Sequence, residues 1–213
     1  MIAMPVRVLL ADDHLVLRQG LKALLQRQGI EVVAEAPDGH TAVELARKLA
    51  PDVAVLDVAM PRLNGVSAAH EIRQASAGTR VILLTALEDA RFVPAALRAG
   101  VRGFVLKAQG ADDLLHAIQE VCRGGLYVSP GVSQAVVDAC SAAGTPIPDR
   151  LSERERQVVQ LVAEGKATKE IASLLKISVK TVEFHRGRVM EKLNIHDTAG
   201  LVRYAIREGL IAP

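Results

Sequence analysis

Four short apolar runs in the first half of this chain each end at a polar side chain, and amphipathic stretches separate them. With one further apolar run they predict strands at residues 6–11, 31–36, 53–57, 80–85 and 103–107. Helices are expected after them, at residues 14–28, 39–49, 65–75, 90–99 and 111–123. Runs of Val, Ile and Leu that alternate with helices are typical of parallel strands buried on both faces. Five such units in so short a stretch predict an α/β doubly wound five-stranded parallel sheet rather than a barrel.

Polar residues follow the strands where their carboxyl ends should meet. Asp12 and Asp13 follow the first strand, and Asp57, Thr85 and Lys107 end three others. In open parallel sheets, ligand sites collect at this edge. Clustered carboxylates repel one another unless a cation lies among them, and hard oxygen ligands suit Mg²⁺. A carboxylate beside a metal, a hydroxyl and a lysine indicates a phosphate-accepting site.

Each of these residues also has a structural explanation when it is taken alone. Asp57 fits a cap of the turn before Pro61, and Asp12 fits the N-cap of the first helix. Lys107 fits a solvated strand end. His14 fits either a metal ligand or the start of the first helix, and the second is favoured because oxygen ligands already satisfy a hard ion. A single strand-end cluster explains the whole set, so the functional interpretation is preferred.

The middle of the chain and its bulk properties predict a two-part protein. Residues 124–150 hold several Gly and Pro residues and are expected to be a linker with one short helix near residues 132–141. None of the 213 residues belongs to an apolar run near the roughly 20 residues of a membrane span. Cys122 and Cys140 show no metal-ligand spacing. We therefore expect a cytoplasmic protein with no membrane partner.

Residues 151–213 predict an all-α four-helix domain. Helices are expected at residues 153–164, 168–175, 179–193 and 197–208, and Ser152 and Glu155 have the spacing of a capping box. A tight turn at residues 176–178, between a short helix and a longer one, is typical of a helix-turn-helix. This part carries 11 Lys and Arg against 8 Asp and Glu, a weak indication of a polyanionic partner.

These motifs are similar to those of a known family. The first half resembles a response-regulator receiver domain in Asp12-Asp13, Asp57-x-x-Met60-Pro61-x-x-x-Gly65, Thr85 and Phe104-x-x-Lys107. The second half resembles the LuxR-type helix-turn-helix in Leu151-Ser152-x-Arg154-Glu155, Glu164-Gly165-Lys166, Lys169-Glu170-Ile171-Ala172 and Lys180-Thr181-Val182-x-x-His185. Together they resemble the NarL/FixJ family of two-component transcription factors. The resemblance implies a flavodoxin-like receiver at residues 5–123, a linker at 124–150 and a DNA-binding domain at 151–213.

The resemblance also implies a role for each residue of the acidic cluster. Asp57 would accept a phosphoryl group from the histidine of a sensor histidine kinase. Asp13 would bind Mg²⁺ directly and Asp12 through water. Asp57 and the backbone carbonyl of Ala59 would complete the protein ligands.

Three more residues would then sense the phosphoryl group. Lys107 would pair with one phosphoryl oxygen, and Thr85 would move inward to bond another. Phe104 would swing into the space that Thr85 leaves, which would turn a local charge change into a change of shape. Taken alone, Phe104 is more simply explained by core packing.

The helix expected at residues 179–193 would be the recognition helix for double-stranded DNA. The expected contact residues are Lys169, Lys180, Thr181, Glu183, Phe184, Arg186, Gly187, Arg188 and Lys192. Glu183 and Phe184 are the ones expected to touch bases, and the cations to hold phosphates. Packing inside the domain remains an alternative for Phe184, as does a solvated side chain for Glu183. Gly187 fits a place where DNA approaches the backbone closely.

The last helix would form the dimer contact in this family, through Leu201, Val202 and Ala205. Core packing within the domain is an equal alternative for some of these side chains. A homodimer formed on phosphorylation would require an operator with paired half-sites. RNA polymerase is a further candidate partner.

Two other classes of protein fit the sequence less well. A phosphate-independent DNA binder with a degenerate receiver conflicts with the complete acidic cluster. A free-standing phosphatase or NTPase would need a Walker loop or a second Asp at position 59, and this chain has neither. We therefore expect a regulator and not an enzyme.

Overall fold

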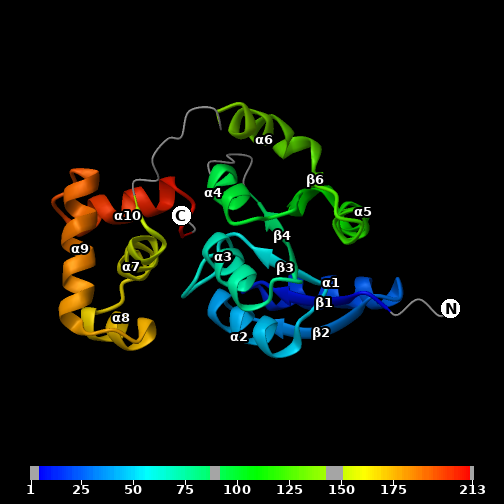
Figure 1. Ribbon diagram of the computed structural model, residues 1–213, viewed down its shortest axis with the longest axis horizontal. Coiled ribbons are helices and arrows are strands. Elements are labelled where there is room, and N and C mark those ends of the chain that lie inside the picture. The colour runs from blue at the N-terminus through cyan, green and yellow to red at the C-terminus, as the bar shows by residue number, and fades with distance from the viewer. Residues whose placement is uncertain (1–4, 87–91, 143–150, 212–213) are drawn as a thin grey trace.

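The computed structural model describes residues 5–86, 92–142 and 151–211. Figure 1 shows a sheet flanked by helices beside a separate group of helices formed by the last part of the chain. The expected pair of an α/β part and an all-α part is therefore confirmed. No helix within the described ranges is long and apolar enough to cross a membrane.

The sheet has six parallel strands in the order β2-β1-β3-β4-β5-β6. The strands are β1 (Arg7–Ala11), β2 (Glu31–Ala36), β3 (Val53–Asp57), β4 (Arg80–Thr85), β5 (Gly103–Leu106) and β6 (Tyr127–Val128). The chain winds outward from β1 to β2 on one side and from β3 on the other. In such sheets the crevice at the carboxyl ends of the two central strands is where ligands bind.

Helices cover both faces of the sheet. One face carries α1 (Leu15–Arg27) and α5 (Ala111–Cys122), and the other carries α2 (Gly39–Leu49), α3 (Gly65–Ala75) and α4 (Val93–Arg98). Along β1, Val8 and Leu10 belong to the core on the α1 and α5 side, and Leu9 and Ala11 belong to the core on the other side. Successive side chains of a strand point to opposite faces, so a continuous apolar run fills both cores.

Residues that we expected to be linker extend this first domain. β6 pairs with β5 and makes a sixth strand, and α6 (Pro130–Ala142) packs on α4 and β5. Val132 and Val136 of α6 are buried in the same core as Phe104. A strand of two residues leaves no periodicity in a sequence, so the prediction of five strands missed it. Residues 143–150 of the expected linker lie outside the described residues.

Several element boundaries differ from the expectation by a few residues, and two of these differences lie near the predicted site. β5 ends at Leu106, and Lys107 begins a short 3₁₀ turn, η1 (Lys107–Gln109), instead of closing the strand. α4 begins at Val93 rather than near residue 90, and residues 87–91 lie outside the described part of the chain. Lys107 still follows the end of β5 directly, so the predicted site keeps its place at this edge of the sheet.

The last part of the chain is the predicted helix-turn-helix. Its helices are α7 (Glu153–Ala163), α8 (Thr168–Leu175), α9 (Val179–Leu193) and α10 (Thr198–Arg207). The capping box at the start of α7 is present: the Ser152 N–H donates to Glu155 Oε2 at 2.7 Å, and Ser152 Oγ accepts from the Glu155 N–H at 3.3 Å. Lys176 adopts a left-handed conformation between α8 and α9, with φ of 53°. This residue makes the tight turn.

Candidate functional site

The three acidic residues predicted at the strand ends do meet. Ligand atoms of Asp12, Asp13, Asp57 and His14 all lie within 4.8 Å of one another. β1 and β3 are neighbours in register, so the residues that end them lie at one edge of the sheet. Asp12 and Asp57 are 1% and 4% exposed, whereas Asp13 is open to solvent. The cluster is therefore a partly buried acidic pocket.

Lys107 reaches into this pocket from η1. Its Nζ lies 2.8 Å from Asp12 Oδ2 and 3.0 Å from Asp57 Oδ2. Burial raises the pKa of Asp57 above its usual value, and the adjacent ammonium offsets only part of this increase. Burial lowers the pKa of Lys107, but Asp57 and Asp12 outweigh that effect and leave the pKa raised. Lys107 therefore stays charged and balances part of the negative charge.

His14 lies at the mouth of the pocket. It is the N-cap residue of α1, so the alternative that Asp12 is that N-cap does not hold. The His14 N–H donates to Asp12 Oδ1 at 2.8 Å, and its exposed ring places Nδ1 2.9 Å from Asp13 Oδ1. The donor set as a whole is dominated by carboxylate oxygens. This chemistry fits a hard divalent cation such as Mg²⁺.

The loop from Val58 to Asn64 carries the backbone next to Asp57. The Val58 N–H donates to the Leu84 carbonyl at 3.0 Å, and the Gly65 N–H donates to the Val58 carbonyl at 2.9 Å. Asn64 caps α3 by accepting from the Ser67 N–H. The loop therefore folds back tightly between β3 and α3, and it includes the predicted carbonyl ligand at Ala59.

Thr85 and Phe104 both point into the protein. Thr85 is 1% exposed at the end of β4, and its register partner on β5 is Leu106. Phe104 is fully buried, and its ring centroid lies 6.5 Å from that of Phe92. The core-packing alternative for Phe104 is thus compatible with this position. The two predicted sensing residues lie on adjacent strands.

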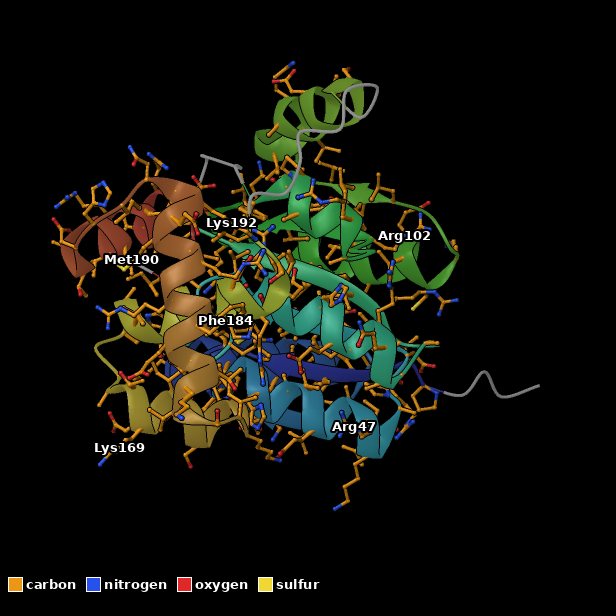
Figure 2. All side chains as sticks on the ribbon, turned by 60° about the vertical axis from the view of Figure 1, so that its left-hand side comes forward. Arg47, Arg102, Lys169, Phe184, Met190 and Lys192 are labelled. Atoms are coloured by element: carbon orange, nitrogen blue, oxygen red, sulfur yellow. The ribbon has the colours of Figure 1, made fainter. Side chains whose placement is uncertain are left out.

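α9 presents one face to solvent. Lys180, Glu183, Phe184, Gly187 and Arg188 are all exposed along it, whereas Val182 and Val189 on the other side are buried in the domain core. The Phe184 side chain is 59% exposed, so it does not pack inside the domain, and the Arg188 guanidinium stacks over its ring at 5.7 Å. Figure 2 shows Phe184 on the outer side of α9, with Lys169 at the edge of the same surface.

Three other expected DNA contacts have partners within the domain. Arg186 donates to Thr198 Oγ1 at 2.8 Å. Thr181 shares a hydrogen bond with Ser178 at the start of α9. The third residue, Lys192, pairs with a carboxylate of α7. Arg186 and Lys192 thus join α9 to α10 and α7, whereas Thr181 bonds at the cap of its own helix.

The pair of Lys192 and Glu155 joins α9 to α7. The Lys192 ammonium lies 2.7 Å from Glu155 Oε2, and the Glu155 side chain is buried. Burial raises the pKa of Glu155, but hydrogen bonds from Lys192 and Ser152 outweigh that effect and leave the pKa lowered. Glu155 therefore stays ionised and keeps the Lys192 ammonium beside it.

The predicted dimer residues of α10 divide into two groups. Leu201 and Ala205 are 1% and 0% exposed and belong to the core of the helical domain. We correct their assignment, because side chains that pack against α7 are not available to a second subunit. Val202 is half-buried, and Ile206 is exposed. The outer face of α10 therefore passes through Val202 and Ile206.

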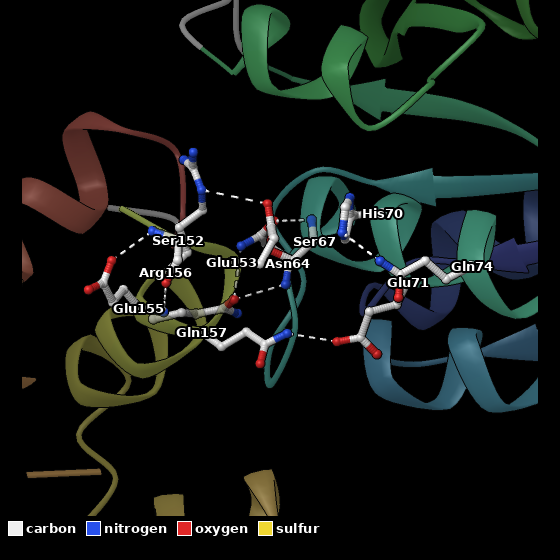
Figure 3. A network of polar contacts seen from close by, with 11 residues as sticks. Asn64, Ser67, His70, Glu71, Gln74, Ser152, Glu153, Glu155, Arg156 and Gln157 are labelled. Atoms are coloured by element: carbon white, nitrogen blue, oxygen red, sulfur yellow. Dashed lines mark hydrogen bonds and ion pairs between the residues drawn. The ribbon is translucent and has the colours of Figure 1, made fainter. Parts of the chain in front are cut away.

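The contact between the two domains was not predicted. α7 lies against α3 and the loop before it, as Figure 3 shows. Ser67 Oγ donates to Glu153 Oε2 at 3.1 Å, and Gln157 Nε2 donates to Glu71 Oε1 at 2.7 Å. Gln160 is fully buried there. The sequence signal for this contact was the pair of Gln157 and Gln160, three residues apart on one helix. Such pairs are common on helices, so the pair did not predict a contact between the domains.

This geometry defines a class of protein with two domains. One is a doubly wound domain with an acidic pocket suited to accept a phosphoryl group, and the other is a helix-turn-helix domain whose recognition helix is exposed. Comparisons with known proteins agree. Residues 8–119 match the response regulator receiver domain, and residues 149–205 match the bacterial regulatory proteins of the luxR family. Receiver domains generally bind Mg²⁺ at such a pocket.

Named relatives match this chain over nearly their whole length. The transcriptional regulatory protein MctR of Rhizobium johnstonii is 36% identical over 208 residues, 97% of this chain and 96% of the relative. The oxygen regulatory protein NreC of Staphylococcus carnosus is 35% identical over 214 residues, 96% of this chain and 99% of the relative. RcsB of Salmonella typhimurium has a TM-score of 0.68 at 28% identity, covering 94% of this chain and 96% of that chain. An RcsB–DNA complex has a TM-score of 0.59 at 26% identity, covering 95% and 98%.

The chain belongs to the NarL/FixJ-type family of response regulators. It is a two-component transcription regulator with a receiver domain and a DNA-binding domain, and this family is not one of enzymes.

Proposed function

We propose that Asp57 is the phosphoacceptor of this regulator and that a sensor histidine kinase is the donor. The position of its carboxylate in the acidic pocket, 3.0 Å from the Lys107 ammonium, is the observation that carries the proposal. A carboxylate oxygen of Asp57 forms a bond to phosphorus while the bond from phosphorus to the histidine nitrogen breaks, and the nitrogen keeps the electron pair. Lys107 then pairs with a phosphoryl oxygen. Thr85 on β4 then moves toward another phosphoryl oxygen, and Phe104 on β5 moves into the space that Thr85 leaves.

Asp12, Asp13, Asp57 and the Ala59 carbonyl are the residues that would hold Mg²⁺. When bound, the ion offsets the repulsion between an anionic phosphoryl group and an anionic carboxylate. The residues of the chain do the rest. Asp57 ends β3 and Asp12 directly follows β1, and the Lys107 ammonium between them offsets the repulsion of their two carboxylates.

We propose residues 5–142 as the receiver unit, because β6 and α6 complete its sheet and core. Residues 143–150 would then be the linker and residues 151–213 the DNA-binding domain. The α9 face of Lys180, Glu183, Phe184, Gly187 and Arg188, with Lys169, would enter the major groove of double-stranded DNA. A homodimer would meet through Val202 and Ile206. A regulator that binds DNA is expected in the cytoplasm, with RNA polymerase a candidate partner.

Phosphodonor labelling tests the proposal. Incubation with acetyl phosphate and Mg²⁺ should add the mass of one phosphoryl group to the wild-type chain and none to Asp57→Ala. Intact-mass spectrometry measures the label, and size-exclusion chromatography with light scattering should show a shift from monomer to dimer. Asp112→Ala, which removes an exposed carboxylate outside the cluster, should label as the wild type does. An unlabelled wild-type chain would instead favour the phosphate-independent DNA binder.

Gly187→Ala should separate stability from DNA binding. A Cβ at Gly187 would meet no other atom within 4 Å, so the helix should gain about 0.5–1 kcal/mol of stability. If DNA approaches this part of α9 closely, the added methyl group should weaken binding about fivefold, near 1 kcal/mol. Urea unfolding and fluorescence anisotropy measure the two effects, with a DNA fragment that the wild-type protein selects from random sequences. Unchanged affinity would remove Gly187 from the interface.

A further inference from the structure

One glutamine of the DNA-binding domain makes all its described hydrogen bonds with the loop that follows Asp57 or with its own helix. Gln160 of α7 is 0% exposed. Its Nε2 donates to the Met60 carbonyl at 2.9 Å, and its Oε1 accepts from the Asn64 N–H at 2.9 Å and from Asn64 Nδ2 at 3.0 Å. The remaining bond of Nε2 goes to Glu164 at 2.8 Å. The side-chain amide therefore bridges both ends of the loop from Met60 to Asn64.

Neighbouring contacts support the same loop and the helix after it. The Arg62 N–H donates to Glu164 Oε1 at 2.9 Å, and Arg62 has a φ of 67°, which residues other than Gly rarely adopt. At the rim, Glu153 and Gln157 bond to Ser67 and Glu71 of α3 instead (Figure 3). The interface thus has a central part on the loop and an outer part on α3.

The loop is a component of the phosphoryl pocket. Met60 directly follows Ala59, whose carbonyl is the predicted metal ligand, and the peptide unit that carries this carbonyl joins the two residues. Fixing the Met60 carbonyl and the Asn64 N–H holds the backbone of residues 60–64. The Ala59 carbonyl lies on the peptide unit directly before this segment. Gln160 therefore restrains the backbone beside the expected ion site without contacting the ion itself.

The packing of the two domains against each other does not require the side-chain amide of Gln160. A buried amide lowers stability unless its polar atoms are satisfied, and an apolar side chain of equal size would bury as much surface. The docked receiver also leaves the outer face of α9 exposed, including Phe184. The contact at Gln160 therefore has a local effect on the loop and does not cover the recognition helix.

We propose that Gln160 is a positioning residue of the phosphoryl pocket, by which the DNA-binding domain holds the loop that presents the Ala59 carbonyl. The proposal rests on the proposed function of the pocket. Coupling of this kind is reciprocal: if docking favours the cation, the cation favours docking to the same extent. In this chain the output domain then contributes to the metal affinity of its own receiver.

Full-length Gln160→Met tests the proposal, because Met keeps the length and helix propensity of Gln and loses its hydrogen bonds. Mg²⁺ affinity measured by isothermal titration calorimetry should fall about tenfold, the low end for residues that orient a metal ligand. Amide hydrogen exchange of residues 58–65 should become faster. Gln157→Met is the matched control, because it removes a contact from the same helix to α3, and its Mg²⁺ affinity should stay within about twofold of the wild type.

A second variant tests the donor group of the amide. Gln160→Glu keeps the acceptor for Asn64, but it replaces the donor with an oxygen that faces the Met60 carbonyl and Glu164, so its Mg²⁺ affinity should fall at least as far as in Gln160→Met. Equal affinities in wild type and both Gln160 variants would overturn the proposal, as would an equal loss in Gln157→Met. The calorimetry needs no phosphodonor, so it tests the two proposals separately. A wild-type protein that binds Mg²⁺ but takes no label would refute only the proposal that Asp57 is the phosphoacceptor. A wild type that binds no Mg²⁺ would refute both.

Discussion

Lys107→Met should lower the free energy of unfolding by about 3 kcal/mol in the absence of divalent cations. Lys107 Nζ is within 3.0 Å of two carboxylates, those of Asp12 and Asp57, and both carboxylates are almost fully buried. Removing the ammonium leaves two buried negative charges next to each other with the exposed Asp13 nearby. Breaking one side of a buried ion pair costs more than the pair contributes, because the partner stays desolvated.

The loss should depend on pH and on Mg²⁺ in a defined direction. The pKa of Asp57 is already raised by burial, and it should rise further without Lys107. A group whose pKa is higher in the folded state binds more protons when folded, so the variant should regain stability as the pH falls through that raised pKa. Mg²⁺ should also stabilise the variant more than the wild type, because it replaces the missing positive charge and no ammonium competes for the carboxylate oxygens.

Thermal and urea unfolding at several pH values, with and without Mg²⁺, measure these effects. Lys48→Met is the control, since Lys48 is an exposed lysine on α2, and it should change stability by less than about 0.5 kcal/mol. A Lys107→Met variant as stable as the Lys48 control at neutral pH would contradict the ion-pair geometry. Mass spectrometry of the same variant after phosphodonor treatment should still show a label. The dimer shift should be lost, because Lys107 is one of the residues expected to sense the phosphoryl group.

Gly65→Ala should destabilise the receiver by about 3 kcal/mol and weaken Mg²⁺ binding. A Cβ at Gly65 would overlap the Asp57 carbonyl oxygen and press on the Val58 backbone. Both obstacles are main chain and cannot rotate away, so the loop must shift. That loop carries Ala59, so a shift of the loop should displace the backbone carbonyl that is expected to hold the ion.

Gly20→Ala is the matched control for this substitution. Gly20 lies inside α1, and a Cβ there would meet nothing within 4 Å. Alanine should therefore stabilise the helix by about 1 kcal/mol and leave Mg²⁺ affinity unchanged. Urea unfolding and calorimetry of the two variants give the comparison. A Gly65→Ala variant that matches Gly20→Ala in both measurements would show that the loop has room for a side chain.

The strands and helices could be predicted because their signals are local. Val53 to Leu56 and Val81 to Leu84 are unbroken apolar runs, and such runs indicate strands buried on both faces. In a parallel sheet all strands point the same way, so the residues that end them lie along one edge. The shared edge of the acidic residues therefore followed from the sequence, and the pairing of β1 with β3 brought Asp12 next to Asp57. The helix-turn-helix was equally readable, because the Ser152 capping box and the turn at Lys176 are short-range features.

Tertiary structure decided which side of an element each residue uses. Leu201 and Ala205 have the same sequence pattern whether α10 meets a second subunit or its own core, and only packing against α7 assigns them inward. Lys192 is a plausible phosphate contact in sequence, yet it pairs with Glu155, 37 residues away. Gln160 bonds to Asn64 across 96 residues. Periodicity carries information about neighbours along the chain, whereas contacts between distant elements depend on how those elements dock.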